Sequence, residues 1–504
     1  MSDLLSQLKT MPSNEAKGQT HALERGEGSK VKTASVGLLA LVVALAVNLL
    51  PPWVVPVAVI GIAGLVLFLR RPVWAVYALV LSVPVQDVVT VGDITVTRVV
   101  FVVTLVIWWM WLALRDDRRF HVTPIGVALI FFWIATLPSL WATSSLSDSL
   151  TELARWGVTI VAFFLIINSV QSRREMNGLI TAMLIACMFQ AVLGLVQAYG
   201  GIGPASFIIQ GTLTRAYGTI GAPNSFAGYI NMSLPLALAL SVYQWGKWAS
   251  ARKAAPYLDR PSFISFDKLK APVGITLITA TLFWTLLTTL SRGAWVGLAF
   301  GLLAMGMAFG KRAAAALGVL FAVGVVILVL GVSGALPAPI TDRFAQLAGQ
   351  LTIYDPRGVV PTPDNYNVLS RLVHWQTAGN MFLASPWTGI GTGNYNLLFV
   401  RFGVQGWPFS AGHAHNFYLH SLAETGLVGT SFYVVMLITS VVVGVRALRS
   451  ARRGGDTYGE AVVVGALGIL ITFMFHNIFE NLHVLNMGIH WGAALALFTF
   501  SKRL

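Results

Sequence analysis

The chain has 504 residues, of which 56% are hydrophobic and 11% are charged, and its mean hydropathy is +0.73. An apolar share this large excludes a soluble globular domain and indicates an integral membrane protein. The formal net charge is +14. We attribute this charge to membrane topology and to attraction for anionic inner-leaflet lipid, and we do not expect nucleic-acid binding.

Apolar runs of roughly 16 to 22 residues recur along the chain, and each is long enough to cross about 30 Å of hydrocarbon as a helix. The pattern predicts an all-α polytopic membrane protein with about fourteen transmembrane helices. These spans are expected to begin near Val36, Trp53, Pro72, Val99, Pro124, Trp156, Met176, Phe226, Pro272, Ala294, Ala313, Leu427, Ala461 and Leu485.

The chain order divides the protein into four predicted parts. Residues 1–34 form a polar cytoplasmic tail without a small-residue cleavage site behind the first span, so we expect no removable signal peptide. Residues 35–333 hold transmembrane helices 1–11, and residues 334–412 form a large, partly helical outer loop. Residues 413–504 hold a histidine motif and transmembrane helices 12–14.

Basic residues set the predicted orientation, because short cytoplasmic loops retain lysine and arginine. All the lysines map to the inner side of the predicted topology, whereas the basic residues on the outer side are all arginines. A guanidinium binds phosphate or carboxylate with two parallel hydrogen bonds, so this bias favours an outer phosphate-bearing ligand. Anchoring in the lipid headgroup region is the alternative. The outer arginines are Arg98, Arg155, Arg215, Arg292, Arg343, Arg357, Arg371 and Arg401.

Two features of the outer loop are predictable. The segment NVLSRLVHWQTAGNMFLASP has helical apolar spacing and stops at Pro386, which predicts an amphipathic helix with Arg371 and Trp375 on one face. The following GIGTGNYN, residues 389–396, superficially resembles a dinucleotide loop but lacks a preceding strand. We therefore predict a turn there.

A histidine-rich segment, AGHAHNFYLHSLAETGLVG, begins at Ala411, at the mouth of a predicted span. The pair His413 and His415 with His420 suggests zinc, but no matching cysteine or carboxylate spacing completes a ligand set, so we expect no metal. His420 and Glu424 stand four residues apart and should pair on one helix face. His415 is the better candidate for a general base.

Four motifs together resemble the O-antigen ligase and polymerase superfamily. In HNFYLHSLAETGLVG, residues 415–429, a histidine and an asparagine are followed by Gly-x-x-Gly, here Gly426 and Gly429. SRGAW at residues 291–295, R-x-x-x-W at residues 371–375 and P-x-x-G-I-G-x-G-N at residues 386–394 also resemble this family, in its usual order. The similarity covers approximately residues 215–429.

The resemblance implies a GT-C-like fold and a metal-independent, cofactor-free glycosyltransferase in the bacterial inner membrane, with its active site facing the periplasm. Such an enzyme moves a glycan from undecaprenyl pyrophosphate to an acceptor hydroxyl, which is a lipid A-core sugar in ligases. The expected partners are the lipid-linked donor, a lipid A-core or glycan acceptor, and membrane lipids.

The resemblance also implies residue roles. His415 matches the family's catalytic histidine, while Arg292 and Arg371 match its arginines in the short turn and the large loop. Arg215 is a further candidate for binding the pyrophosphate. The candidate supporting residues are Asn416, Glu424 and Trp375.

Alternative functions stay open from the sequence. Within the superfamily, an O-antigen or exopolysaccharide polymerase or a protein O-oligosaccharyltransferase is the alternative to a ligase. Outside it, an anion or solute transporter or a non-catalytic scaffold would use the same arginines differently. A transporter usually places its charged sites near the bilayer midplane, whereas these polar clusters map to outer helix ends.

Overall fold

Helices dominate the part of the chain that the computed structural model describes, which comprises residues 64, 67–86, 90–91, 94–113, 120–209, 213–254, 266–333, 353–362, 365–407 and 409–500. Residues 71–504 form one compact unit and residues 1–70 another. The predicted polar tail and the spans beginning near Val36 and Trp53 lie outside the described residues.

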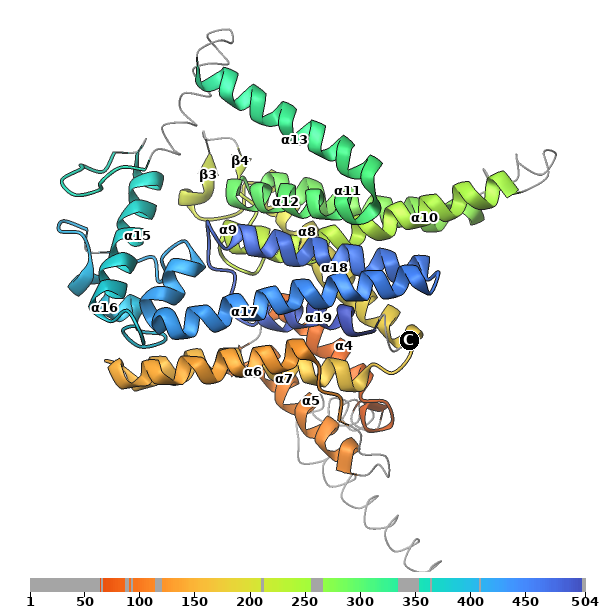
Figure 1. The fold of residues 1–504 in the computed structure, drawn as a ribbon, viewed down its shortest axis with the longest axis horizontal. Coiled ribbons are helices and arrows are strands. Elements are labelled where there is room, and N and C mark those ends of the chain that lie inside the picture. The colour runs from red at the N-terminus through yellow and green to blue at the C-terminus, as the bar shows by residue number, and fades with distance from the viewer. Residues whose placement is uncertain are drawn as a thin grey trace, which may run out of the picture. The chain divides into compact units, whose positions relative to one another are not determined.

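The helices of the first half run in sequence order, and Figure 1 shows them with their labels. They are α4 (Val73–Ser82), the 3-10 helix η1 (Val83–Val85), α5 (Val96–Ala113), α6 (Pro124–Thr136), η2 (Leu137–Ala142), α7 (Leu146–Ser169), α8 (Arg173–Gly200), η3 (Ala205–Phe207), α9 (Pro223–Asn231) and α10 (Leu234–Ala254).

The helices of the second half include the longest one in the described part of the chain. They are α11 (Phe266–Thr288), α12 (Arg292–Phe309), α13 (Lys311–Val332), α15 (Tyr366–Ala384), α16 (Tyr395–Phe402), α17 (Phe417–Arg453), α18 (Thr457–His476) and α19 (Met487–Phe500). The described strands form only two small antiparallel hairpins: β1 (Thr90–Val91) with β2 (Ile94–Thr95), and β3 (Ile208–Ile209) with β4 (Leu213–Thr214).

The described ranges hold nine helices that are long and apolar enough to cross a membrane, and two shorter apolar helices at residues 73–85 and 487–500. This confirms an all-α polytopic membrane protein. A helix occupies every predicted span from Pro72 onward. The total of fourteen spans stays a prediction.

Two helices begin about three turns before the predicted spans. Helix α7 starts at Leu146, not near Trp156, and α17 starts at Phe417, not near Leu427. Hydropathy marks only the apolar run, whereas a helix begins where its first amides are capped. The side chain of Ser145 accepts from the backbone of Asp148 at α7, and Asn416 caps α17 in the same way.

Glycines bring several helices into close backbone contact. A Cβ at Gly297 would lie 2.7 Å from the carbonyl oxygen of Thr472, and one at Gly301 would lie 2.8 Å from that of Gly468. Small residues therefore let α12 pack directly on the backbone of α18. Helices α15 and α16 build a second, smaller apolar cluster beside α17, outside the main transmembrane core. In Figure 1 they lie at the end of the bundle where α17 begins.

Helix α17 is interrupted at Gly426, which has φ 62° and ψ −162°. The loop before α16 fills this break with backbone hydrogen bonds. The amides of Leu427 and Val428 donate to the carbonyls of Pro386 and Trp387, while those of Ile390 and Gly391 donate to Ala423 and Glu424. A Cβ at Gly426 would lie 2.4 Å from the carbonyl carbon of Trp387, so this contact requires glycine.

Candidate functional site

A cavity of about 590 Å³ opens where α15, the α11–α12 turn and the loop before α17 meet. It gathers segments that are far apart in the sequence. Its walls are formed by Arg215, Asn224, Leu290, Arg292, Trp295, Tyr366, Asn367, Ser370, Arg371, Ala411 and His415. The cavity is therefore lined by the three principal residues predicted from the sequence, His415, Arg292 and Arg371, and by the further candidate Arg215.

The three arginines concentrate positive charge in this cavity. Burial lowers the pKa of the Arg215 guanidinium, and the charges of Arg371 and Arg292 lower it further, whereas Glu480 raises it. Arg215 is held by its Nε donating to the carbonyl of Thr289 at 2.8 Å and by Nη2 donating to Oδ1 of Asn224 at 2.9 Å. Three guanidinium groups line one cavity, and the charge of Glu480 offsets that of Arg215 only in part, so the cavity favours an anion.

The short turn between α11 and α12 places Arg292 at the first position of α12. Leu290 lies in this turn with φ 51°, a conformation that non-glycine residues rarely adopt. The next position must be small, because a Cβ at Gly293 would lie 2.7 Å from Cβ of Phe479. The SRG motif thus combines a tight turn, an arginine at the cavity and close packing against the end of α18.

His415 lies two residues before the start of α17 and also has a positive φ, 49°. The next residue, Asn416, is the N-cap of α17, with its Oδ1 accepting from the backbone of Leu419 at 3.1 Å. The amide of Phe417 donates to the carbonyl of Asn477 at 2.8 Å, which ties this helix start to the loop after α18. Asn416 fixes the backbone beside the histidine, and it is not among the cavity-lining residues.

Glu480, in the loop between α18 and α19, is the buried carboxylate nearest this histidine cluster. Its Oε1 lies 3.1 Å from Nε2 of His413 and 3.6 Å from Nδ1 of His415, and its Oε2 accepts from Nδ2 of Asn224 at 2.8 Å. Burial alone would raise the pKa of Glu480, but His413, His415 and the Asn481 amide lower it well below the ordinary value. Glu480 is therefore an anion that links His415 through Asn224 to Arg215.

The same three side chains have the composition of a metal site. One ligand atom each from His413, His415 and Glu480 lies within 4.8 Å of the others. However, Nδ1 of His413 accepts the backbone N–H of His415 at 3.0 Å. In a neutral imidazole the proton then sits on Nε2, 3.1 Å from Oε1 of Glu480, and leaves no lone pair for a metal. The hydrogen bonds favour a proton-holding cluster over a metal centre.

His374 clamps the histidine loop to α15. Its Nδ1 donates to the carbonyl of Ser370 at 2.6 Å, and its Nε2 accepts the amide of Ala411 at 2.8 Å. Burial lowers the pKa of His374 to about 4, with the hydrogen bond to Ser370 acting in the opposite direction. The ring is therefore neutral, and it packs edge-on against His415 with centroids 5.4 Å apart.

The predicted amphipathic helix is confirmed as α15, and one of its faces lines the cavity. Tyr366, Asn367, Ser370 and Arg371 of this helix all line the cavity. Tyr366 is 51% exposed and packs on Trp407 with ring centroids 5.4 Å apart and planes 30° apart. We call the three guanidinium groups the cationic part of the cavity, and the aromatic ring, amide and hydroxyl of Tyr366, Asn367 and Ser370 its uncharged part.

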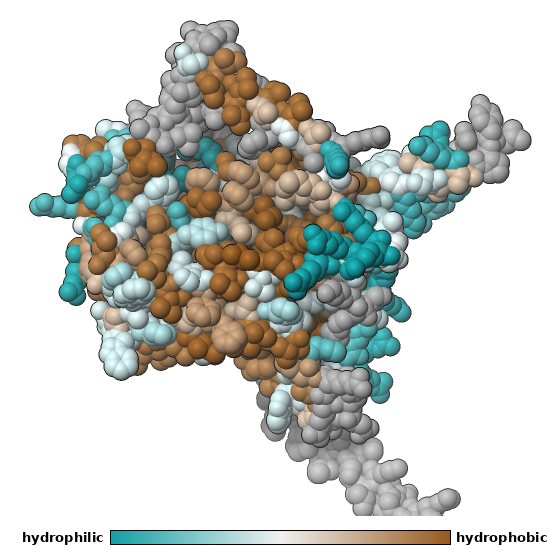
Figure 2. All heavy atoms as spheres, viewed as in Figure 1, coloured by the Kyte–Doolittle hydropathy of each residue, from teal (hydrophilic) through white to brown (hydrophobic). Residues whose placement is uncertain are grey.

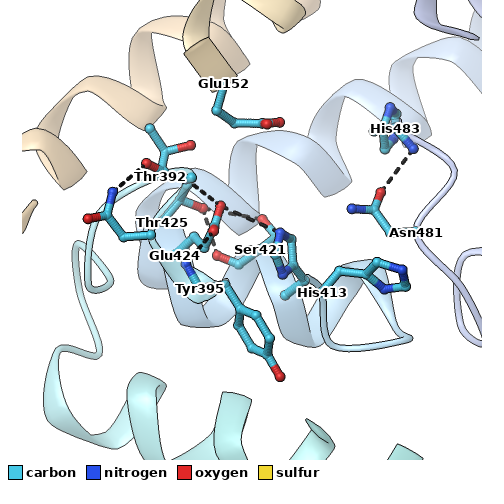
Figure 3. A network of polar contacts seen from close by, with 12 residues as sticks. Glu152, Thr392, Tyr395, His413, Ser421, Glu424, Thr425, Asn481 and His483 are labelled. Atoms are coloured by element: carbon cyan, nitrogen blue, oxygen red, sulfur yellow. Dashed lines mark hydrogen bonds and ion pairs between the residues drawn. The ribbon is translucent and has the colours of Figure 1, made fainter. Parts of the chain in front are cut away.

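Two other predicted supporting residues lie outside the cavity lining. The Glu424 carboxylate accepts the amides of Gly393 and Tyr395 at 2.8 and 2.9 Å, and Figure 3 shows it directed at the loop that carries Thr392 and Tyr395. Its predicted neighbour His420 lies 3.6 Å away, as expected for the helical pair. Glu424 therefore stabilises the scaffold of the site. Trp375 is partly buried one turn after Arg371, and its indole Nε1 has no hydrogen-bond partner among the described residues.

The glycine-rich segment is a turn, as predicted, and its backbone packs against α17. Gly389, Gly391 and Gly393 all have positive φ. A Cβ at Gly389 would lie 2.2 Å from the carbonyl carbon of Glu424. The motif therefore lets this loop dock on the break in α17.

The remaining outer arginines have other surroundings. Arg155 pairs with Glu152 within α7, Arg357 pairs with the exposed Asp355, and the guanidinium of Arg401 lies over the ring of Phe402. Arg343 lies outside the described residues. Among the described residues, a predicted outer location therefore does not decide which arginines line the cavity.

Sequence reasoning missed Glu480, Asn224 and His374. An available indication was that Glu480 is an acidic residue in a short segment between two apolar spans, and a carboxylate in such surroundings usually has a partner. Asn224 had no distinguishing context beyond a Gly/Pro/Asn turn.

Residues 277–434 match a protein-family model described as O-antigen ligase. The match spans the SRG turn, the outer loop and the histidine motif, and it confirms the resemblance predicted from those motifs. Arg215, Asn224 and Glu480 lie outside the matched residues but share the site. A comparison with curated proteins gives no match.

Proposed function

From the premise that residues 277–434 place this chain in the O-antigen ligase and polymerase superfamily, we propose that it is a lipid-linked oligosaccharide ligase. It transfers a glycan from undecaprenyl pyrophosphate to a hydroxyl of lipid A-core at the outer face of the bacterial inner membrane. The observation that carries this proposal is the single cavity that joins three arginines to His415.

In the proposed reaction, the acceptor oxygen attacks the anomeric carbon of the donor sugar. The bond from that carbon to the phosphate oxygen breaks, and undecaprenyl pyrophosphate leaves with the electron pair. His415 Nε2 takes the acceptor proton, a role typically worth about 10²–10⁴ in rate. A single displacement inverts the anomeric centre.

Glu480 supports the base in this scheme. In this scheme the neutral ring of His415 carries its proton on Nδ1, 3.6 Å from Oε1 of Glu480, which leaves Nε2 to accept the second proton. The buried carboxylate stabilises the imidazolium that then forms, as the carboxylate of a catalytic triad does. Glu480 is a positioning residue, since it does not line the cavity.

The leaving group accumulates negative charge, and Arg215, Arg292 and Arg371 stabilise it. Fixed guanidinium groups replace the divalent cation that many glycosyltransferases use. The tautomer of His413, which directs its Nε2 proton at Glu480, supports a reaction without metal. The uncharged part of the cavity then receives the sugar attached to the diphosphate, with Tyr366 as a stacking surface and Asn367 and Ser370 as hydroxyl partners.

The decisive experiment incubates the purified full chain with an undecaprenyl-pyrophosphate-linked oligosaccharide and EDTA, with or without lipid A-core acceptor. Products are resolved by gel and mass spectrometry. We expect glycan transfer only when lipid A-core is present, and no transfer by His415→Ala. Arg401→Ala serves as a matched control, because this arginine lies outside the cavity lining.

Each alternative outcome has its own meaning. A ladder of longer lipid-linked glycans without lipid A-core would identify a polymerase, and transfer to added protein would identify an O-oligosaccharyltransferase. Loss of activity in EDTA that Zn²⁺ restores would contradict the metal-free scheme. No turnover of any lipid-linked donor by folded protein would contradict catalysis and favour anion transport.

A further inference from the structure

The end of α17 opposite to His415 carries a second concentration of arginines. A cavity of about 530 Å³ there is lined by Arg446, Arg449, Arg452 and Arg453. Arg452 pairs with Glu460 at 2.7 Å and also donates to the carbonyl of Ala308. The other three are exposed and form no ion pair with any described residue. They leave unbalanced positive charge at this end of the helix.

These three arginines continue an exposed apolar stripe of the same helix. Val435, Ile438 and Val442 are 51%, 55% and 41% exposed. The six positions 435, 438, 442, 446, 449 and 453 are spaced by three or four residues, so they share one face of α17. Figure 2 shows strongly hydrophilic surface bordering hydrophobic surface toward the end of the bundle where α17 ends.

The dimensions of the stripe match one membrane leaflet. From Val435 to Arg446 the helix rises about 16 Å, close to half of a hydrocarbon core of about 30 Å. A lipid whose acyl chains lie beside Val435, Ile438 and Val442 would therefore bring its headgroup phosphate to the level of Arg446 and Arg449. A guanidinium fork complements a phosphodiester directly.

From this juxtaposition we propose that the α17 stripe is a specific binding site for an anionic phospholipid. Its acyl chains lie along Val435, Ile438 and Val442, and its headgroup phosphate is held by Arg446, Arg449 and Arg453. A single basic residue at a helix end would only anchor the helix. Three unneutralised arginines in register with one exposed apolar stripe fix a lipid in place.

The test uses the full-length purified protein, stripped of lipid in mild detergent, and native mass spectrometry with added phosphatidylglycerol or phosphatidylcholine of identical chains. We expect one phosphatidylglycerol to bind at least tenfold more tightly than phosphatidylcholine. The triple variant Arg446→Gln/Arg449→Gln/Arg453→Gln should weaken phosphatidylglycerol binding by roughly 10²-fold, since each surface arginine contributes a factor of roughly five.

The matched control is Lys247→Gln/Arg252→Gln/Lys253→Gln, which removes three exposed basic residues from the end of α10. This control should bind phosphatidylglycerol as tightly as the wild type does. Unchanged phosphatidylglycerol affinity in the α17 variant would overturn the proposal. Displacement of the lipid by millimolar inorganic phosphate would also overturn it, because the site would then bind a soluble anion. The readout is independent of glycosyl transfer, so it stands apart from the proposed function.

Discussion

The Oε1 atom of Glu480 lies 3.6 Å from Nδ1 of His415, although α17 and α18 separate the two residues in the chain. The backbone joins them as well, since Phe417 donates to Asn477 at 2.8 Å. The histidine and its carboxylate are thus held together by two loops at the same ends of neighbouring helices.

The first prediction concerns the proposed base. His415→Gln should lower kcat by about 10²–10⁴, because the acceptor proton loses its receiver. Steady-state transfer with the lipid-linked donor measures this change. Size-exclusion chromatography of the variant must show a folded monodisperse protein, and a folded variant with wild-type kcat would refute the base.

The second prediction separates positioning from binding. Glu480→Gln keeps shape but removes the charge that stabilises the imidazolium, so kcat should decrease by roughly 10–10³ while the donor KM stays nearly constant. The same kinetic assay checks it. Asn224→Ala should give a weaker version of this effect, because Asn224 donates to Glu480 at 2.8 Å. An increase in donor KM alone would assign Glu480 to substrate binding.

The third prediction concerns the cationic part of the cavity. Arg292→Ala and Arg371→Ala should each lower kcat/KM by about 10²–10³. Both should also weaken inhibition by undecaprenyl pyrophosphate without sugar. Tyr366→Leu should weaken binding of the sugar-bearing donor but leave inhibition by undecaprenyl pyrophosphate unchanged. This difference distinguishes the two parts of the cavity. If Tyr366→Leu weakened binding of both ligands equally, Tyr366 would not be a binding surface for the sugar.

The fourth prediction tests the break in α17. Gly426→Ala places a methyl group 2.4 Å from the carbonyl carbon of Trp387 at a positive φ, so it should destabilise the fold by more than about 2 kcal/mol. Thermal unfolding in detergent measures the change. Gly379→Ala on α15 is the control, since a Cβ there meets nothing within 4 Å. Equal melting temperatures for both variants would contradict the proposed docking.

The fifth prediction is a loss of stability in acid. Burial lowers the pKa of both His374 and His413 from 6.5 to about 4. Between these values the unfolded chain binds protons that the folded chain excludes, so stability is complete above pH 6.5 and decreases as the pH falls towards 4. The decrease should be roughly 3 kcal/mol per histidine. Melting temperatures at pH 4–8 measure this decrease, and His374→Gln should make the melting temperature depend less on pH. A wild-type melting temperature that does not change with pH would contradict a neutral, buried His374.

Much of the architecture was predictable because hydropathy and helix length are local properties. The amphipathic spacing around Arg371 predicted α15, and the missing strand before GIGTGNYN correctly predicted a turn. The starts of α7 and α17 were wrong, since capping by Ser145 and Asn416 extends both helices beyond the apolar run.

The site was predictable where a motif carried it and, for Arg215, from an outer Gly/Pro/Asn turn that leads into a span. His415 and Arg292 stand in motifs, whereas Glu480 and Asn224 reach the site through helix packing that no local pattern encodes. Glu424, in contrast, stands in a motif but does not line the cavity. Its place in the histidine motif suggested chemistry, but its carboxylate caps the amides of Gly393 and Tyr395.

The loop that docks at Gly426 is held largely by main-chain donors and acceptors, including the bonds from Leu427 to Pro386 and from Ile390 to Ala423. Main-chain bonds are indifferent to side-chain identity. Side chains at positions such as Thr388 and Leu427 can therefore vary without loosening the contact between this loop and α17, as long as Gly426 remains.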